Sequence, residues 1–151
     1  MLPDIFSIEA SQQIITRLNA LTPTTQPTWG KMNVAQMLAH CNVTYEMVYD
    51  DIHKRPNALM RFILKLVLKA TVVSEKPYSQ NSSTAPQFII KDGKNFEVEK
   101  ARLIAFIHKT VELGGSHFDQ KESHSFGKLS TLEWNNLFFK HLDHHLRQFG
   151  V

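Results

Sequence analysis

Apolar residues recur at helical spacing along almost the whole chain, and this periodicity restricts the fold more than any other feature of the sequence. Two capping boxes mark helix starts most clearly, because each pairs a side-chain acceptor with a Glu or Gln three residues later. Asn33 with Gln36 begins one of these helices, and Ser130 with Glu133 begins the other. We therefore expect an all-α protein.

Further start and stop signals divide the chain into helical segments. Ser7 is a suitable N-cap, Pro56 must end or break a helix, and Gly114 with Gly115 forms a C-terminal stop. The expected helices run from Ser7 to Leu21, from Asn33 to about Asp51, from Asn57 to about Val73, from Phe96 to Leu113, and from Ser130 to about Gln148. The first of them is expected to bury Ile8, Ile14, Ile15 and Leu18.

Irregular segments connect these helices. Residues 22–31 contain two prolines and a glycine, and residues 74–94 contain two prolines and four serines. Only Gln87–Ile90 has a pattern suited to a short strand. Four major helices and one shorter helix, joined by long loops, predict a four-helix bundle that occupies residues 1–151 as a single domain.

The composition is ordinary for a globular protein, with 42% hydrophobic and 21% charged residues. Cys41 is the single cysteine, which fits a reducing compartment. The opening MLPDIFSIEA lacks the features of a secretory signal, and no window offers about 18 uninterrupted apolar residues. We therefore expect a cytoplasmic protein. The net charge of +3 comes from scattered Lys and Arg, so no nucleic-acid partner is expected.

The segment KHLDHHLRQFGV, residues 140–151, carries three of the eight histidines of the chain. Buried imidazoles without partners are costly, so either metal coordination or strong hydrogen bonds must offset the cost. An i, i+4 pair of histidines can share one metal ion, and the sequence leaves both explanations open. On a helical wheel, His141 and His145 lie on the apolar face together with Trp134, Leu137, Phe138 and Phe149.

A third ligand would come from another helix, and His40 is the best candidate. It lies at the edge of the apolar stripe of the second helix, where a side chain can reach the seam between two helices. Cys41 lies at the centre of that stripe, where a free cysteine usually acts as a small hydrophobic residue. The stripe consists of Val34, Met37, Leu38, Cys41, Tyr45 and Val48.

Other polar residues carry weaker signals. His144 is expected at the flank of the last helix, and Asp143 is expected to point to solvent. Leu142 stands where the HExxH motif of zinc proteases has its glutamate base, so a peptidase is excluded. Four further histidines are expected at the surface or in the loop before the last helix, without a ligand-like spacing: His53, His108, His117 and His124.

The helix expected from Asn57 to about Val73 is amphipathic. One side is strongly apolar, and Arg61, Lys65 and Lys69 lie four residues apart on the other. Such a helix can pack its apolar side into the core or a dimer interface, or it can lie on an anionic membrane. Packing into the core or a dimer interface is the expected arrangement, so no membrane partner is expected.

Three features of the sequence together resemble the DinB-like superfamily of YfiT-type metalloenzymes. They are the connection Trp29-Gly-Lys-Met-Asn33, the segment Met37-Leu-Ala-His40, and the spacing His141-x-x-x-His145. The phrases SHSFGKLSTLEW and KHLDHHLRQFGV resemble an uncharacterised branch of it, known only as a domain of unknown function. The resemblance covers nearly the whole chain.

This resemblance implies a four-helix bundle of up-down-down-up topology, often present as a homodimer. It also implies a divalent metal ion held by His40, His141 and His145. Zinc, nickel and iron all accept imidazole ligands. Some superfamily members resemble thiol-dependent S-transferases, in which the metal lowers the pKa of a low-molecular-weight thiol.

Two classes of function follow for this chain. The first is a metalloenzyme, because three neutral imidazoles leave the ion an open position for a thiol or water. Such an enzyme would transfer a thiol to a small electrophile, or act as a hydrolase. The second is a non-catalytic helical bundle whose histidines bind metal loosely or not at all. The metal content of the purified protein separates the two classes.

Overall fold

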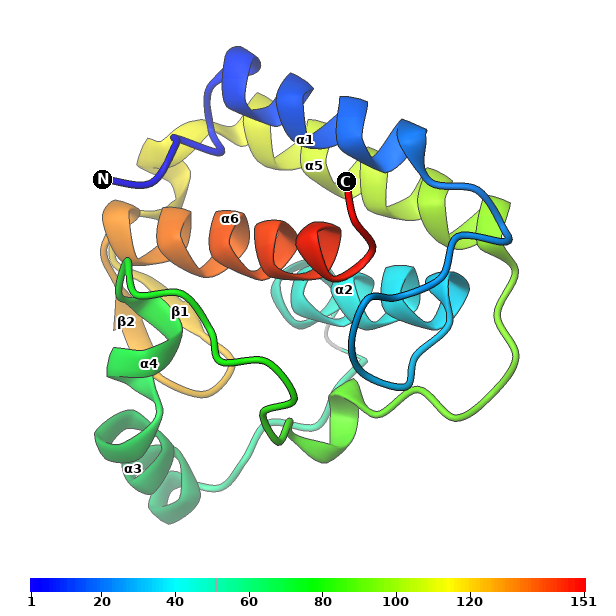
Figure 1. The fold of residues 1–151 in the computed structure, drawn as a ribbon. Helices are drawn as coiled ribbons and strands as arrows, with labels where there is room; N and C mark the ends of the chain where they lie inside the picture. The colour runs from blue at the N-terminus through cyan, green and yellow to red at the C-terminus, as the bar shows by residue number, and fades with distance from the viewer. Residues whose placement is uncertain (51) are drawn as a thin grey trace.

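The computed structural model describes residues 1–50 and 52–151, and their backbone is mostly helical (Figure 1). Asp51, the expected end of the second helix, lies outside the described residues. In chain order the elements are α1 (Ile8–Ala20), α2 (Val34–Tyr49), α3 (Ala58–Val67), α4 (Lys69–Val73), the 3-10 helix η1 (Pro86–Phe88), α5 (Phe96–Phe118), β1 (Lys121–Ser123), β2 (Gly127–Leu129) and α6 (Thr131–Gln148).

Helices α1, α2, α5 and α6 contribute to one apolar core. Aromatic rings lie in contact within it: Tyr45 of α2 stacks on Phe138 of α6 at a centroid distance of 5.0 Å, and Phe138 stacks on Trp134 at 5.3 Å. Burial of apolar side chains of this kind contributes about 25 cal/mol per Å² of surface removed from water. Aliphatic side chains fill the space around the rings: Ile14, Leu18, Met37, Leu38, Leu103, Ile107, Leu142 and Leu146.

Hydrogen bonds at the helix N-termini confirm the expected helix starts. In the capping box of α2, Asn33 N donates to Gln36 Oε1 at 3.1 Å, and Gln36 N donates to Asn33 Oδ1 at 2.9 Å. In the capping box of α6, Ser130 N donates to Glu133 Oε2 at 2.9 Å. These bonds satisfy amide groups that the helices themselves leave without partners.

Residues 57–73 form two short helices rather than the single helix that the periodicity predicts. The chain turns at Leu68, which ends α3 and begins α4 with φ −110° and ψ −25°. The turn brings the end of α4 against α6, where Lys140 Nζ donates to the carbonyl oxygens of Thr71 and Ser74 at 2.7 and 2.5 Å. Helical periodicity contains no information about this tertiary contact.

One expectation of burial is wrong. Ile8 is 79% exposed at the start of α1, although the apolar pattern places it in the core. No residue of α3 is buried, so the apolar side of that helix does not pack into the core of the chain, and a dimer interface, the other arrangement expected for it, stays a prediction. A search of the described helices finds none with the length and apolar character needed to cross a membrane.

The region after α5 contains an antiparallel hairpin that the sequence did not predict. Lys121 pairs with Leu129 and Ser123 with Gly127, and Ser123 Oγ donates to Gly127 O at 2.7 Å. Strands of three residues are too short to show an alternating pattern. Gly114, with φ 71°, interrupts α5 as expected, but the helix resumes for a further turn.

The long connection of residues 74–94 is irregular apart from η1, which lies beside α2 in Figure 1. The strand considered at Gln87–Ile90 is not formed, because Pro86–Phe88 form η1 instead. Proline lacks the amide donor that a strand needs but fits the first position of a helical turn. This turn places a backbone carbonyl against α2, in the part of the molecule that holds the expected site residues.

Candidate metal centre

Helices α2 and α6 bring three histidines together in the interior of the molecule. His40 comes from α2, and His141 and His145 come from successive turns of α6. One ring nitrogen of each lies within 4.8 Å of the others, and the Nε2 atoms of His40 and His141 are 3.0 Å apart. Two nitrogens bound tetrahedrally to one zinc ion lie about 3.3 Å apart. The three residues selected from the sequence therefore form a cluster with the dimensions of a metal site.

The packing of α2 against α6 sets the spacing of this cluster. His40 and His145 are buried, and His141 is partly buried. The ring centroids of the three histidines are 4.5 to 5.0 Å apart in each pair. The stacked pair of Tyr45 and Phe138 lies next to the cluster in sequence on the same two helices, so the apolar core fixes the helix separation at this level.

The outer nitrogen of His40 is held by the irregular connection. His40 Nδ1 lies 2.8 Å from the backbone oxygen of Phe88 in η1. A carbonyl oxygen only accepts, so Nδ1 carries the hydrogen and donates it. The neutral ring then has a lone pair on Nε2, which is directed at the other two histidines.

The outer nitrogen of His145 is held by Gln148, one turn further along α6. Nδ1 lies 2.8 Å from Gln148 Oε1, and Gln148 Nε2 donates to Trp29 O at 2.8 Å. The second bond orients the amide so that its oxygen faces the ring. Gly30 leaves room for this contact, because a Cβ at that position would lie 2.5 Å from Gln148 Nε2.

The outer nitrogen of His141 is held by Thr44 of α2, whose Oγ1 lies 2.9 Å from Nδ1. All three Nδ1 atoms are thus engaged, by a hydroxyl, an amide oxygen and a backbone carbonyl. In metal centres, histidine ligands almost always have the second ring nitrogen bonded in this way, which fixes the orientation and tautomer of the ring. The arrangement fits three imidazoles that present Nε2 to one ion.

The interior location keeps the three rings neutral. Burial lowers the pKa of His40, and burial together with repulsion from the neighbouring rings lowers the pKa of His141 well below its ordinary value. Burial, reinforced by His40, lowers the pKa of His145 to about 3. Neutral imidazole is the form that coordinates metal, so near neutral pH no proton has to leave before an ion binds.

The residues between the two α6 histidines do not join the cluster. Asp143, expected to point to solvent, instead forms ion pairs with Arg17 of α1 at 2.8 Å and with Arg147 at 3.0 Å. His144 lies at the flank, as expected, with its ring 5.9 Å from Trp29 and 5.0 Å from His145. The group that fits a metal therefore consists of imidazoles alone.

The remaining candidates lie outside the cluster. Cys41 is buried, and burial raises the pKa of its thiol, so it behaves as the small hydrophobic residue expected. His53 was expected at the surface, but it is partly buried, and its Nε2 lies 2.7 Å from Glu46 Oε2. His124 is also buried, 3.2 Å from the backbone oxygen of His53. The other two histidines, His108 and His117, are exposed.

Sequence reasoning missed the three groups that hold the outer nitrogens. Gln148 could have been found, because it lies three residues after His145 on the same side of α6. Thr44 could not have been found from the sequence, because its partner lies 97 residues away on another helix. The Phe88 contact uses a backbone carbonyl, which every residue has, so no residue type signals it.

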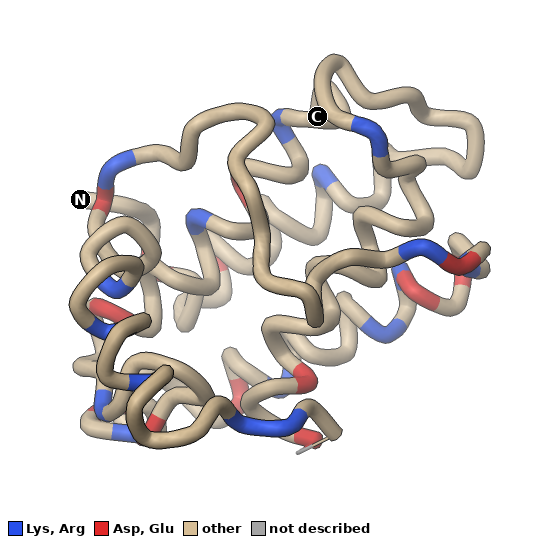
Figure 2. Tube along the Cα trace, turned by 90° about the horizontal axis from the view of Figure 1, so that it is seen from below, with Lys and Arg blue, Asp and Glu red and all other residues tan. Residues whose placement is uncertain are grey.

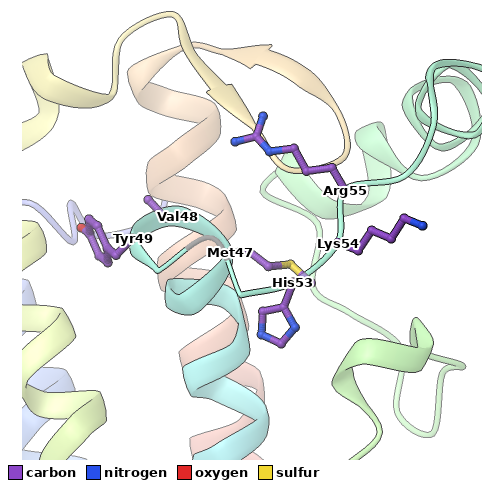
Figure 3. Close-up of a pocket in the computed structure, with 6 residues that line it drawn as sticks. All are labelled: Met47, Val48, Tyr49, His53, Lys54 and Arg55. Atoms are coloured by element: carbon purple, nitrogen blue, oxygen red, sulfur yellow. The ribbon is translucent and has the colours of Figure 1, made fainter.

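A separate cavity of about 470 Å³ opens at the C-terminal end of α2. Figure 3 shows Lys54 and Arg55 pointing to different sides of the chain segment, so their charges do not converge on one point. Because the two positive charges lie apart, they do not form a binding site for an anionic ligand in this cavity. It is lined by Met47, Val48, Tyr49, His53, Lys54 and Arg55.

Comparison with known proteins gives one match. A family described as "Protein of unknown function (DUF1569)" matches residues 4–150 of the chain. No curated protein and no solved structure matches.

Proposed function

The chain belongs to the DUF1569 family of proteins of unknown function, and on that premise we propose that it binds one divalent metal ion through His40, His141 and His145. The observation that carries the proposal is the bonding of the outer nitrogens. Each Nδ1 has its own partner, whereas the three Nε2 atoms lie on the inner side of the cluster. A hydrogen bond can also join the Nε2 atoms of His40 and His141, which lie 3.0 Å apart, so the support for a metal site is the close approach of all three rings.

The donor set limits the ion to metals that accept imidazole. Zinc, nickel and iron do so, whereas magnesium and calcium prefer oxygen ligands. Three neutral imidazoles leave the charge of the ion uncompensated and leave at least one coordination position for another ligand. A divalent ion in such a site lowers the pKa of a thiol or of water in the open position.

The proposed activity is thiol-dependent S-transfer to a small electrophile, with hydrolysis as the other reaction that the same site supports. This activity rests on the resemblance to the DinB-like superfamily, as do the up-down-down-up four-helix bundle and the homodimer. The residues of the chain would contribute orientation: Thr44, Gln148 and the Phe88 carbonyl hold the three rings toward one point. The alternative function is metal binding by a non-catalytic helical bundle.

Metal analysis tests the binding proposal directly. The protein purified without added metal, and after dialysis against zinc, nickel or iron(II), is analysed for its elements and titrated calorimetrically. We expect one ion per chain in the wild type and loss of stoichiometric binding in His145→Ala. The matched control is His108→Ala, which removes an exposed histidine outside the cluster and should leave one ion per chain. A wild-type protein that binds none of the three metals overturns the proposal.

A second assay separates the enzyme from the binding protein. Metal-loaded protein is incubated with a low-molecular-weight thiol and a chromogenic electrophile, and thiol consumption is followed. S-transfer predicts a rate that disappears in His145→Ala and persists in His108→Ala. Stoichiometric metal binding without thiol consumption or ester hydrolysis would favour the non-catalytic alternative.

A further inference from the structure

Helix α3 turns Arg61 toward the body of the molecule. Arg61 of α3 forms an ion pair with Glu122 of β1, and Lys69, at the start of α4, pairs with Glu133 of α6 at 2.7 Å. Figure 1 shows α3 at the edge of the molecule, beside α4. The ion pairs fix the rotation of this segment about its axis, and the side opposite the charges faces outward.

The outward side is apolar along its whole length. Within α3, which is described completely, no residue is buried. The outward side chains recur at the i, i+3, i+4 and i+7 positions of one helix face. Their exposed fractions are 70% for Leu59, 47% for Met60, 59% for Phe62, 43% for Ile63, 67% for Leu66 and 66% for Val67.

This outer face of α3, defined by those six residues, is large for a surface that meets only water. It exposes on the order of 600 Å² of apolar area, at the upper end of the roughly 300–600 Å² of the largest patch on a typical monomer. At about 25 cal/mol per Å², covering it would be strongly favourable. A contiguous apolar patch of this size marks an interaction surface.

The charge around the outer face indicates what covers it. From Ile52 to Ser74 the sequence contains five Lys or Arg residues and neither Asp nor Glu. Lys54, Arg55 and Lys65 are exposed among them. Figure 2 shows Lys and Arg spread over the molecule, several of them on the side of α3 and α4, where Asp and Glu also lie. The apolar face therefore has a basic rim.

We propose that α3 docks this protein on an anionic lipid surface. The apolar side chains would enter the boundary between headgroups and acyl chains, and the basic rim would lie among the anionic headgroups. A second copy of the chain offers the apolar surface but repeats the same segment without acidic residues, so the rims are not complementary. The lipid surface supplies both the apolar layer and the negative charge. This proposal does not depend on the metal site.

Vesicle binding tests it. The wild-type protein is mixed at low salt with vesicles of phosphatidylcholine alone, or of phosphatidylcholine and phosphatidylglycerol in equal parts, and the bound fraction is measured by co-sedimentation. We expect binding to the anionic vesicles only, weakened by added salt because the charges at the surface are screened. The double variant Phe62→Ser/Leu66→Ser should bind at least tenfold more weakly. Lys65→Glu should bind several-fold more weakly, since one basic residue near such a surface contributes about 1 kcal/mol.

The matched control replaces apolar residues of similar exposure elsewhere. Val98 of α5 and Leu132 of α6 are 53% and 49% exposed, and Val98→Ser/Leu132→Ser should bind vesicles as the wild type does. Circular dichroism confirms that each variant is folded. Absence of wild-type binding, or equal binding to both kinds of vesicle, overturns the proposal. A wild-type dimer that dissociates in Phe62→Ser/Leu66→Ser, without vesicle binding, assigns the face to a second copy instead.

Discussion

Two regions of this molecule depart from the usual pattern of apolar side chains inside and polar side chains outside, one by burying polar rings and the other by exposing apolar side chains. The histidine cluster buries three polar rings between α2 and α6, but each ring has a hydrogen-bond partner on its outer side. The outer face of α3 exposes six apolar residues, and Arg61 and Lys69 of the same segment pair with acidic residues of the body of the protein. In both regions one side has partners within the chain, and the other side is the basis of a proposed interaction.

For a buried polar residue or an exposed apolar one, the side with partners in the chain explains how the residue is held. The opposite side indicates what it can bind. The partners of the outer nitrogens account for the burial of the imidazoles, and the close approach of the three rings on the inner side is the basis of the proposed metal site. Likewise, the ion pairs of Arg61 and Lys69 account for the orientation of α3, and the apolar side identifies the surface to be covered. The two regions differ in chemistry, so a metal ion should affect only the first and a lipid surface only the second.

The largest expected effect is the loss of metal-induced stability in the cluster. At a free metal concentration about 100 times the dissociation constant, the ion should raise the free energy of unfolding by about 2.7 kcal/mol. His40→Ala removes one ligand and should abolish this increase, measured by urea unfolding with and without metal. Leu66→Ser alters only α3 and should keep it. Equal stabilisation of both variants would show that the ion binds elsewhere.

The next effect concerns the support of a ligand. Thr44→Val removes the hydroxyl that holds His141 Nδ1 but keeps the size of the side chain. Loss of such a support typically weakens metal affinity 10–100-fold, which is about 1.4–2.7 kcal/mol. Competition with a chromogenic chelator measures the affinity, and Thr44→Ser should retain it. An unchanged affinity in Thr44→Val would exclude an orienting role for the hydroxyl.

A smaller effect is expected from acid in the metal-free protein. Unfolded histidine binds a proton below about pH 6.5, whereas burial lowers the pKa of folded His145 to about 3. Between these values the unfolded chain binds more protons, so the free energy of unfolding should fall as the pH falls. We expect a loss of about 1–2 kcal/mol by pH 5, measured by urea unfolding. His145→Gln should show a shallower pH dependence, and an equally steep one would assign the effect to other groups.

The smallest effect is expected on the outer face of α3. Leu66 is 67% exposed, so Leu66→Ser should change the free energy of unfolding by less than about 0.5 kcal/mol. Leu38 is fully buried, and Leu38→Ala should cost about 2–5 kcal/mol. Urea unfolding of both variants sharpens the contrast between face and core. A loss of more than about 1 kcal/mol in Leu66→Ser would mean that self-association buries the face in solution.

Local signals predicted the helix starts and the residues of the cluster. Asn33 and Ser130 could be recognised as caps because their hydrogen-bond partners lie three residues away. His141 and His145 could be recognised because their spacing and the apolar face are properties of one helix. His40 was a candidate from its position at the edge of a stripe and from the family resemblance, and its distance to His141 required the structure.

The contacts that orient α3 and α4 could not be predicted. The end of α4, beyond the turn at Leu68, is held by Lys140 of another helix. The outward direction of α3 depends on its ion pair with Glu122 in a hairpin whose strands are too short to recognise. An amphipathic pattern predicts that a helix has one apolar and one polar side. Which of the two sides faces the protein depends on contacts with the rest of the fold.

The two helices that share the histidine cluster lie far apart in the chain, since His40 and His141 are separated by 101 positions. An ion bound to both would act as a reversible cross-link that closes a loop of most of the protein. Separation of α2 from α6 would then require release of the ion, so slow opening motions of these helices would become linked to metal exchange. A chain with one cysteine, which cannot form an internal disulfide, would in this way acquire a cross-link that a chelator can remove.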